Sequence, residues 1–413
     1  MSPDRWEDVW RIETPHVLAA LLRRSADFES CEDAVQESLL AAANQWPTEG
    51  TPRNPRGWLI RVASRKLIDH QRSHAARAQR ELDAAAQDPA EYADPAHNPT
   101  AASGDDTLQM LLLCAHPSLS VASQVALTLR AVAGLSTAQI AAGFLVPEAT
   151  MAQRISRAKS TLRTAGARFE APTPGDLPAR LHVVRHVLYL TFNEGYAMSS
   201  GSGLVDADLA DEAIRLAERL HRSTPGDTET GGLLALMLLT HARTRARTDQ
   251  YGELVPLAMQ DRTLWDQDGI ARGTTLLEEC LPTGGIGPFQ LQAAIAAVHG
   301  QAATAEATDW TQITMLYRML DRLAPSPTVA LNLAIAVGMA HGPAAALSAL
   351  TPLLGRPDQR RNHRVHAAHA HLLDMAGSTT EARDAYRRAA SFAGSVPEQR
   401  YLNRQAERAD DPA

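Results

Sequence analysis

Apolar positions recur every three to four residues along most of this chain, and no stretch alternates strictly between apolar and polar residues. Residues 148–163 show the pattern most clearly, with apolar side chains at i, i+4, i+7 and i+11, namely Met151, Ile155, Ala158 and Leu162. Such spacing puts one apolar stripe on a helix, whereas a half-buried strand repeats every second residue. The periodicity therefore predicts an all-α fold.

Two segments interrupt this periodicity. Residues 81–104 are rich in Ala, Asp, Pro and Asn, a composition that predicts a flexible acidic linker. Residues 171–178, APTPGDLP, form a proline-rich boundary. We therefore expect a helical region at 1–80, the linker at 81–104, a second helical region at 105–170 and a third at 179–405.

Two helices of the first region carry polar residues that are candidates for function. Residues 31–47 predict a helix whose inward positions are Val35, Leu39, Ala43 and Trp46, and whose opposite face holds a small acidic patch of Asp33, Gln36 and Glu37. Residues 54–73 predict a helix with Leu59, Val62, Ala63 and Leu67 inside and with Arg61, Arg65 and Arg72 along an exposed stripe. Taken alone, the acidic patch is typical of solvated surface. Trp58 suits the core better than an exposed base-stacking site.

The third region repeats itself loosely. GSTTEARDAYRRAASF places Gly377, Ala382, Tyr386 and Ala389 at spacings like those of the second helix of a tetratricopeptide repeat. Similar frames occur at 210–225, 313–325 and 342–354. A single helix pair leaves an apolar face exposed, so we expect these pairs to stack on one another.

Charge is distributed in blocks, although the 413 residues sum to a net charge of −7. Residues 51–80 and 149–168 are strongly basic, and residues 81–107 between them are acidic. A nucleic-acid partner is therefore compatible with the local charge despite the negative total.

Cysteine usage and hydropathy point to a reduced, soluble protein. The three cysteines are far apart and form no CxxC pair, which favours a reducing compartment. No apolar run is long enough for a membrane span, and the first residues lack the pattern of a secretion signal. We expect a cytoplasmic protein without a membrane partner.

Residues 137–163 match the pattern of a helix-turn-helix. A short apolar helix at 137–144 is followed by a break, and Pro147 suits the first turn of the next helix. That second helix carries a polar face made of Thr150, Gln153, Arg154 and Arg157. Arg can bond guanine edges and Gln can bond adenine, while a basic face also neutralises phosphates. For this segment alone, an ordinary solvated basic helix is an equally good interpretation.

Three segments in this order resemble a known family. EDAVQESLLAAANQWP is similar to region 2.2 of bacterial RNA polymerase sigma factors of the sigma-70 superfamily, extracytoplasmic-function type. GWLIRVASRKLIDHQR resembles regions 2.3 and 2.4, and TAQIAAGFLVPEATMAQRISRAK resembles region 4.2. The remainder, from LYLTFNEGY to TDWTQI, resembles the long tetratricopeptide-like C-terminal extension of one sigma subgroup.

This resemblance implies a noncatalytic initiation subunit that directs core RNA polymerase to promoters. It implies that Asp33, Gln36 and Glu37 contact the β′ clamp helices, and that region 4 contacts the β flap. It implies −10 element contacts by Trp58, Arg61, Arg65, Lys66 and Arg72, and −35 element contacts by Thr150, Gln153, Arg154, Arg157 and Lys159. The acidic linker would occupy the RNA channel of the polymerase, or else serve only to solubilise the chain.

A helix-turn-helix regulator with a tetratricopeptide sensor is the alternative function. Such a regulator has no need of the segments at 31–47 and 54–73, so their presence favours the sigma factor. The extension would modulate activity in cis or through a soluble regulator.

The extension also holds a polar and aromatic cluster. Phe192, Asn193, Glu194, Tyr196, Asp261 and Arg262 form either a contact surface or signal pocket, or a set of helix caps and buried hydrogen bonds, which is the interpretation we favour. Four histidines at 363–371 lie on one predicted helix, but only Asp374 could complete a metal site. We expect no metal, no cofactor and no catalytic residues.

Overall fold

The computed structural model describes residues 4–25, 27–83, 106–144, 146–167, 173, 175–196, 207–281 and 285–409. The predicted acidic linker at 81–104 falls almost entirely outside these residues. Helices account for the regular structure of the described part of the chain, where an isolated bridge between Thr248 and Leu254 is the sole β pairing. The all-α prediction is confirmed. None of the described helices is both long and apolar enough to cross a membrane.

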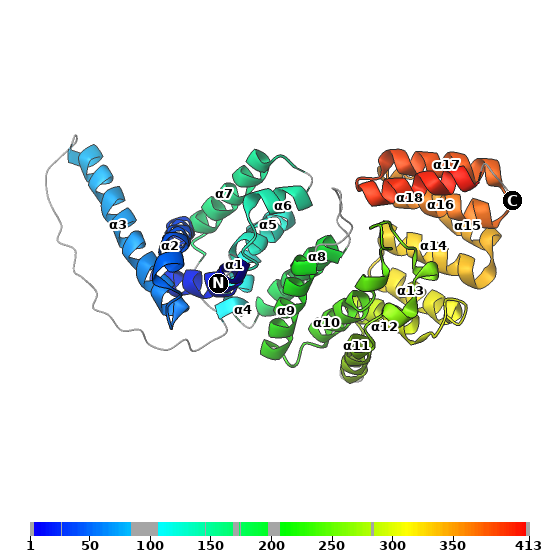
Figure 1. Ribbon diagram of the computed structural model, residues 1–413, viewed down its shortest axis with the longest axis horizontal. Helices are drawn as coiled ribbons and strands as arrows, with labels where there is room; N and C mark the ends of the chain where they lie inside the picture. Colours follow the sequence, from blue (N-terminus) through cyan, green and yellow to red (C-terminus); the bar gives the residue numbers. More distant parts are fainter. Residues whose placement is uncertain are drawn as a thin grey trace. The chain divides into compact units, whose positions relative to one another are not determined.

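The chain divides into two compact units, residues 1–187 and 188–413. The helices of the first unit, with α8 crossing its boundary, are α1 (Asp4–Leu22), α2 (Phe28–Glu49), α3 (Pro55–Asp83), α4 (Asp106–Cys114), α5 (Val121–Ala131), α6 (Thr137–Gly143), α7 (Glu148–Thr164) and α8 (Leu177–Tyr196). In this unit α1, α2 and α3 pack on one another, and α4 to α7 form a second group (Figure 1).

Local signals explain where α2 begins and ends. The Asp27 carboxylate accepts a hydrogen bond from the backbone N–H of Glu29 at 3.2 Å, which satisfies an amide that has no partner within the helix. At the other end Gly50 adopts φ +84°, a left-handed conformation that a residue with a Cβ rarely takes. Trp46 and Leu59 are almost completely buried where α2 and α3 meet.

The inward face of α2 differs from the prediction at two positions. Val35 and Trp46 are buried as expected, but Leu39 is half-buried and Ala43 is exposed, and the preceding residues Ser38 and Ala42 are buried in their place. From Val35 to Trp46 the buried positions of α2 advance in steps of three, four and four residues, which keeps the stripe near 3.6 residues per turn. The predicted stripe placed its single step of three at the end instead of the beginning, so its two middle positions fall one residue beyond the buried ones.

The second unit is a series of helices, each packed on its neighbours in sequence. They are α9 (Ala207–Ser223), α10 (Thr228–His241), α11 (Gln267–Cys280), α12 (Pro288–Gln301), α13 (Trp310–Leu323), α14 (Pro327–His341), α15 (Pro343–Leu354), α16 (His363–Met375), α17 (Thr379–Phe392) and α18 (Val396–Arg408). Residues 242–266, between α10 and α11, contain three short 3-10 turns.

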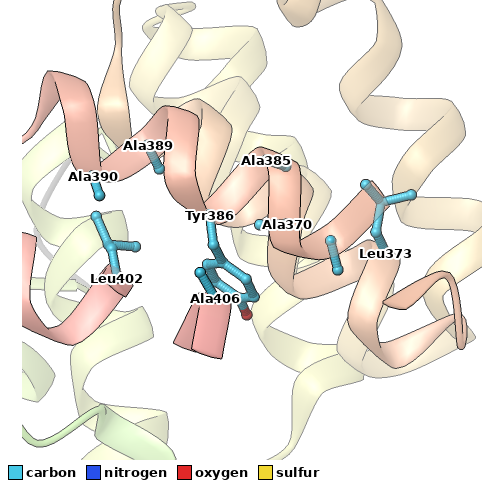
Figure 2. Close-up of a cluster of buried hydrophobic side chains, with 9 residues drawn as sticks. Ala370, Leu373, Ala385, Tyr386, Ala389, Ala390, Leu402 and Ala406 are labelled. Atoms are coloured by element: carbon cyan, nitrogen blue, oxygen red, sulfur yellow. The ribbon is translucent and has the colours of Figure 1, made fainter. Parts of the chain in front are cut away.

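Small residues set the close packing of this unit. In α17 Ala382, Tyr386 and Ala389 are all buried, as their spacing predicts, against residues of α16 and α18 (Figure 2). A Cβ on Gly232 of α10 would lie 2.8 Å from the backbone nitrogen of Gln290, which shows how closely α12 approaches. Stacked pairs thus bury the apolar faces that each pair alone would expose.

Candidate nucleic-acid interface

Helix α7 separates an apolar face from a polar one, as its sequence predicts. Met151, Ile155, Ala158 and Leu162 are each at most 5% exposed. Thr150, Gln153 and Arg157 are exposed, and Arg154 is half-buried with its guanidinium carbon 5.5 Å from the centre of the Phe144 ring. The short helix α6 packs beside α7, so the pair has the two-helix arrangement of a helix-turn-helix. The turn residue Leu145 lies outside the described residues.

Lys159 has a different environment from the other predicted DNA contacts of α7. Its side chain is 11% exposed, and its amine donates to the carboxylate of Glu32 in α2. Arg130 of α5 donates to the other oxygen of the same carboxylate at 2.8 Å. Glu32 is 5% exposed, so one nearly buried anion joins two cations. At the rim of this contact Arg163 lies 3.2 Å from Glu29.

The sequence did not lead us to Glu32 or Arg130. The available signal was the position of Glu32 beside Cys31, on the side of α2 that carries the buried stripe. Glu is rarely buried unless it is paired, so a Glu on an apolar face indicates a cationic partner. The identity of that partner depends on contacts between α2 and distant helices.

The basic stripe of α3 is present on the surface. Arg61, Arg65 and Arg72 are exposed. Of the four positions predicted to lie inside, Leu59, Ala63 and Leu67 are buried and Val62 is half-buried. Trp58 is half-buried, with its ring 5.6 Å from that of Trp46 in an edge-on arrangement. Trp58 is therefore supported by the core on one side and remains partly accessible.

The acidic patch of α2 is linked to α3. Asp33 is exposed, and Gln36 and Glu37 are half-buried. Glu37 accepts from Lys66 at 3.0 Å and pairs with His70 at 2.8 Å. The hydrogen bond from Lys66, joined by that from His70, lowers the pKa of Glu37 below its ordinary value. The carboxylate is therefore held in its charged form.

Comparison with known proteins matches these helices to two regions of one family. Residues 10–77 match the model of sigma-70 region 2, and residues 109–162 match that of sigma-70 region 4. A probable ECF RNA polymerase sigma factor, SigI of Mycobacterium tuberculosis, is 32% identical over 157 residues, which are 36% of this chain and 51% of that protein. The chain belongs to the sigma-70 family, in its extracytoplasmic-function type.

Another protein is similar to this sigma factor along the whole length of the chain. An uncharacterized protein of Rhizobium meliloti (strain 1021) is 40% identical over 422 residues, which are 100% of this chain and 98% of that protein. Residues 180–281 match a family of unknown function, DUF6596. No solved structure matches the chain.

In sigma-factor terms, the pairing of Glu32 with Arg130 and Lys159 joins region 2 to region 4. A second contact supports this junction, where His16 of α1 and Arg23, just after the end of α1, approach Asp106 of α4. Asp106 is 6% exposed, so this contact is also shielded from solvent. The two promoter-binding regions therefore form one unit in this conformation.

The polar cluster of the extension consists largely of caps and packing contacts. Phe192 is 1% exposed and stacks on Tyr196 with ring centres 5.7 Å apart, while Asn193 and Glu194 are half-buried. Asp261 accepts from the backbone N–H of Thr263 at 2.9 Å and thereby caps a 3-10 turn. Arg262 donates to the carbonyl oxygen of His299 at 2.8 Å, near the end of α12.

The four histidines of α16 do not gather around a common point. His363 lies 3.4 Å from Glu398, and His366 bonds the carbonyl oxygen of Arg360 at 2.9 Å. Across the described ranges of the chain, no group of three or more His, Cys, Asp or Glu side chains could hold a metal ion.

Proposed function

We propose that this sigma factor binds core RNA polymerase through the acidic patch of α2, with the β′ clamp helices as the partner surface. Asp33 is exposed and carries a carboxylate, and Lys66 and His70 hold the neighbouring Glu37 carboxylate in place, so the patch presents acidic groups in a fixed arrangement. Charge complementarity of this kind favours rapid and oriented association. Region 4 would contact the β flap of the same enzyme.

The promoter contacts follow from the two basic faces. The exposed arginines of α3, together with Trp58 and Lys66, would engage the −10 element and its opened strand. The polar face of α7 would enter the major groove at the −35 element through Thr150, Gln153, Arg154 and Arg157. The observation that carries this proposal is the separation of buried and polar faces on α7. Lys159 would join the −35 contacts only after it leaves Glu32.

Run-off transcription with purified core polymerase tests this function. We expect transcripts that depend on this protein and that share paired −35 and −10 elements upstream. Arg154→Ala should weaken initiation by about 1–3 kcal/mol if Arg154 reads a base. Arg222→Ala, on the exposed side of α9, serves as the matched control and should leave initiation unchanged. Binding to duplex DNA without any binding to core polymerase would instead establish the helix-turn-helix regulator.

The acidic patch has its own test. Asp33→Ala combined with Glu37→Ala should weaken binding to core polymerase while the helical content stays the same. Binding as tight as that of the wild type would refute the assignment of the patch to polymerase.

We further propose that the extension, predicted at residues 179–405, modulates the activity of regions 2 and 4. A cleavage site for a specific protease, inserted between Gly166 and Leu177, allows the same protein to be assayed before and after separation. A change in promoter-dependent transcription on cleavage is expected. Unchanged transcription, with cleavage shown on a gel, would refute modulation in cis.

A further inference from the structure

Three of the four arginines in the segment between α10 and α11 are half-buried, and their charges are not balanced by acids. Arg243, Arg247 and Arg262 form no ion pair with Asp or Glu in the part of the chain that the structure describes. Glu306 and Glu398 act on Arg262 and Arg247 only at longer range. A concentration of positive charge in a partly buried place is costly without a compensating anion.

Two of these arginines are used to hold the segment in place. Arg247 donates to the carbonyl oxygen of Tyr196, the last residue of α8, and its guanidinium carbon lies 3.8 Å from the centre of the Tyr196 ring. Arg262 donates to the carbonyl oxygen of Ala302 at 2.5 Å and to that of His299 at 2.8 Å. Each therefore satisfies carbonyl groups at the C-terminal end of a helix, where a cation is favoured.

Arg243 has no such role. Its Nε is buried and has no hydrogen-bond partner. Its guanidinium carbon lies 6.0 Å from the centre of the Trp265 ring, and that of Arg262 lies 4.6 Å from the same centre. Both cations are thus held against one indole. Arg243 as a whole is half-buried, which leaves it accessible to a small ligand.

Buried nitrogen atoms around Arg243 also lack partners. Trp265 is 3% exposed and its Nε1, which can only donate, has no acceptor. His299 is 9% exposed and its Nδ1 is likewise without a partner. Burial, together with the charges of Arg243 and Arg262, lowers the pKa of His299 to about 4, so the imidazole is neutral near pH 7.

Arg243 Nε and Trp265 Nε1 are buried donors without partners beside cations without acid partners, and this combination favours an anionic acceptor as the ligand. Leaving each such donor unsatisfied costs about 1–3 kcal/mol, which a bound oxyanion would recover. Phosphate fits better than carboxylate, because its additional oxygens and second negative charge match several donors and more than one guanidinium. The burial of Trp265 and His299 favours a small molecule over a polymer.

We propose that Arg243, with Arg262, Trp265 and His299, forms a binding site for a phosphate group in the extension. The ligand is either free phosphate or a small phosphorylated molecule. The site does not depend on how regions 2 and 4 bind DNA, and it gives the extension a specific ligand class.

Calorimetric titration of the full chain tests the proposal, with inorganic phosphate, glycerol 3-phosphate and acetate as separate probes. We expect saturable binding of a phosphate probe and none of acetate at the same concentration. Tighter binding of glycerol 3-phosphate than of phosphate would indicate an organic phosphate, and the reverse would indicate the free ion. Equal binding of acetate, or no saturable binding of either phosphate probe, would overturn the proposal.

Variants locate the binding. Arg243→Gln should weaken phosphate binding at least about tenfold, because one charged hydrogen-bond donor group is lost. Arg222→Gln, an exposed arginine on α9, should bind as the wild type does. Trp265→Phe keeps a ring at this position but lacks Nε1, and it should weaken binding severalfold even if Arg243→Gln does not fold. If Arg243→Gln folds, unchanged phosphate binding by this variant would overturn the assignment. If it does not fold, unchanged binding by folded Trp265→Phe would overturn it.

Discussion

Replacing Glu32 by Gln is expected to separate region 4 from region 2. The Glu32 carboxylate is the shared acceptor of Arg130 and Lys159, and its side chain is 5% exposed. Glutamine has the same size but no charge, so the variant leaves two cations close together in surroundings of low polarity. Removing one partner of a buried ion pair costs about 3–5 kcal/mol.

The exposure of the partners sets where in this range the effect should lie. Lys159 is 11% exposed and Arg130 is 20% exposed, so both cations regain some hydration without a large movement. We therefore expect a cost at the lower end of this range, about 3 kcal/mol. This corresponds to about a hundredfold change in the ratio of molecules in which regions 2 and 4 are joined to molecules in which they are separated.

Fluorescence energy transfer between α2 and α7 measures this ratio. Leu40 is 65% exposed and Ser160 is exposed, so each accepts a label after replacement by Cys, while the native thiols are buried. Transfer should fall in Glu32→Gln. If Lys159 contacts the −35 element as proposed, affinity for duplex promoter DNA should rise at the same time.

Glu29→Gln is the matched control for this experiment. Glu29 is on the same helix and pairs with Arg163, but the two side chains are 41% and 52% exposed. An exposed pair contributes only about 0–1 kcal/mol, so energy transfer should hardly change. Equal transfer in Glu32→Gln and the wild type, or an equal decrease in both variants, would refute the role of the buried charge.

Three further predictions concern stability and reactivity. Gly232→Ala should lower the free energy of unfolding by about 1–3 kcal/mol, because the added Cβ would meet the backbone of Gln290. Gly226→Ala is the control: its Cβ would enter open space, so thermal denaturation should be nearly unchanged. The pKa of His299 is lowered from 6.5 to about 4, so its contribution to the free energy of unfolding is present above pH 6.5 and is lost as the pH falls towards 4. Urea unfolding of His299→Gln should therefore show a smaller decrease in the free energy of unfolding between pH 7 and pH 5 than the wild type shows. All three cysteines are buried, and burial raises the pKa of each thiol. A thiol reagent at pH 8 should therefore react quickly only after denaturation. Rapid reaction of the native protein would contradict this burial.

Local periodicity carried most of the fold prediction. A helix repeats every 3.6 residues whatever it packs against, so Met151, Ile155, Ala158 and Leu162 could be assigned to one buried stripe before the structure was known. The same reasoning misplaced Leu39 and Ala43 of α2 by one residue, because periodicity alone does not fix where in the stripe the single step of three residues falls. Segment order, rather than any single motif, indicated the sigma-70 family.

The helices and the polar face of α7 could be predicted from the sequence because they depend on neighbours within a few turns, and the family could be recognised because three such segments follow one another in a set order. The partners of Glu32 could be identified only from the folded chain, because they are 98 and 127 residues away in the sequence. The same holds for Arg243, whose charge acts on the distant His299. Such contacts depend on how separate helices pack, and no short-range pattern in the sequence encodes that packing.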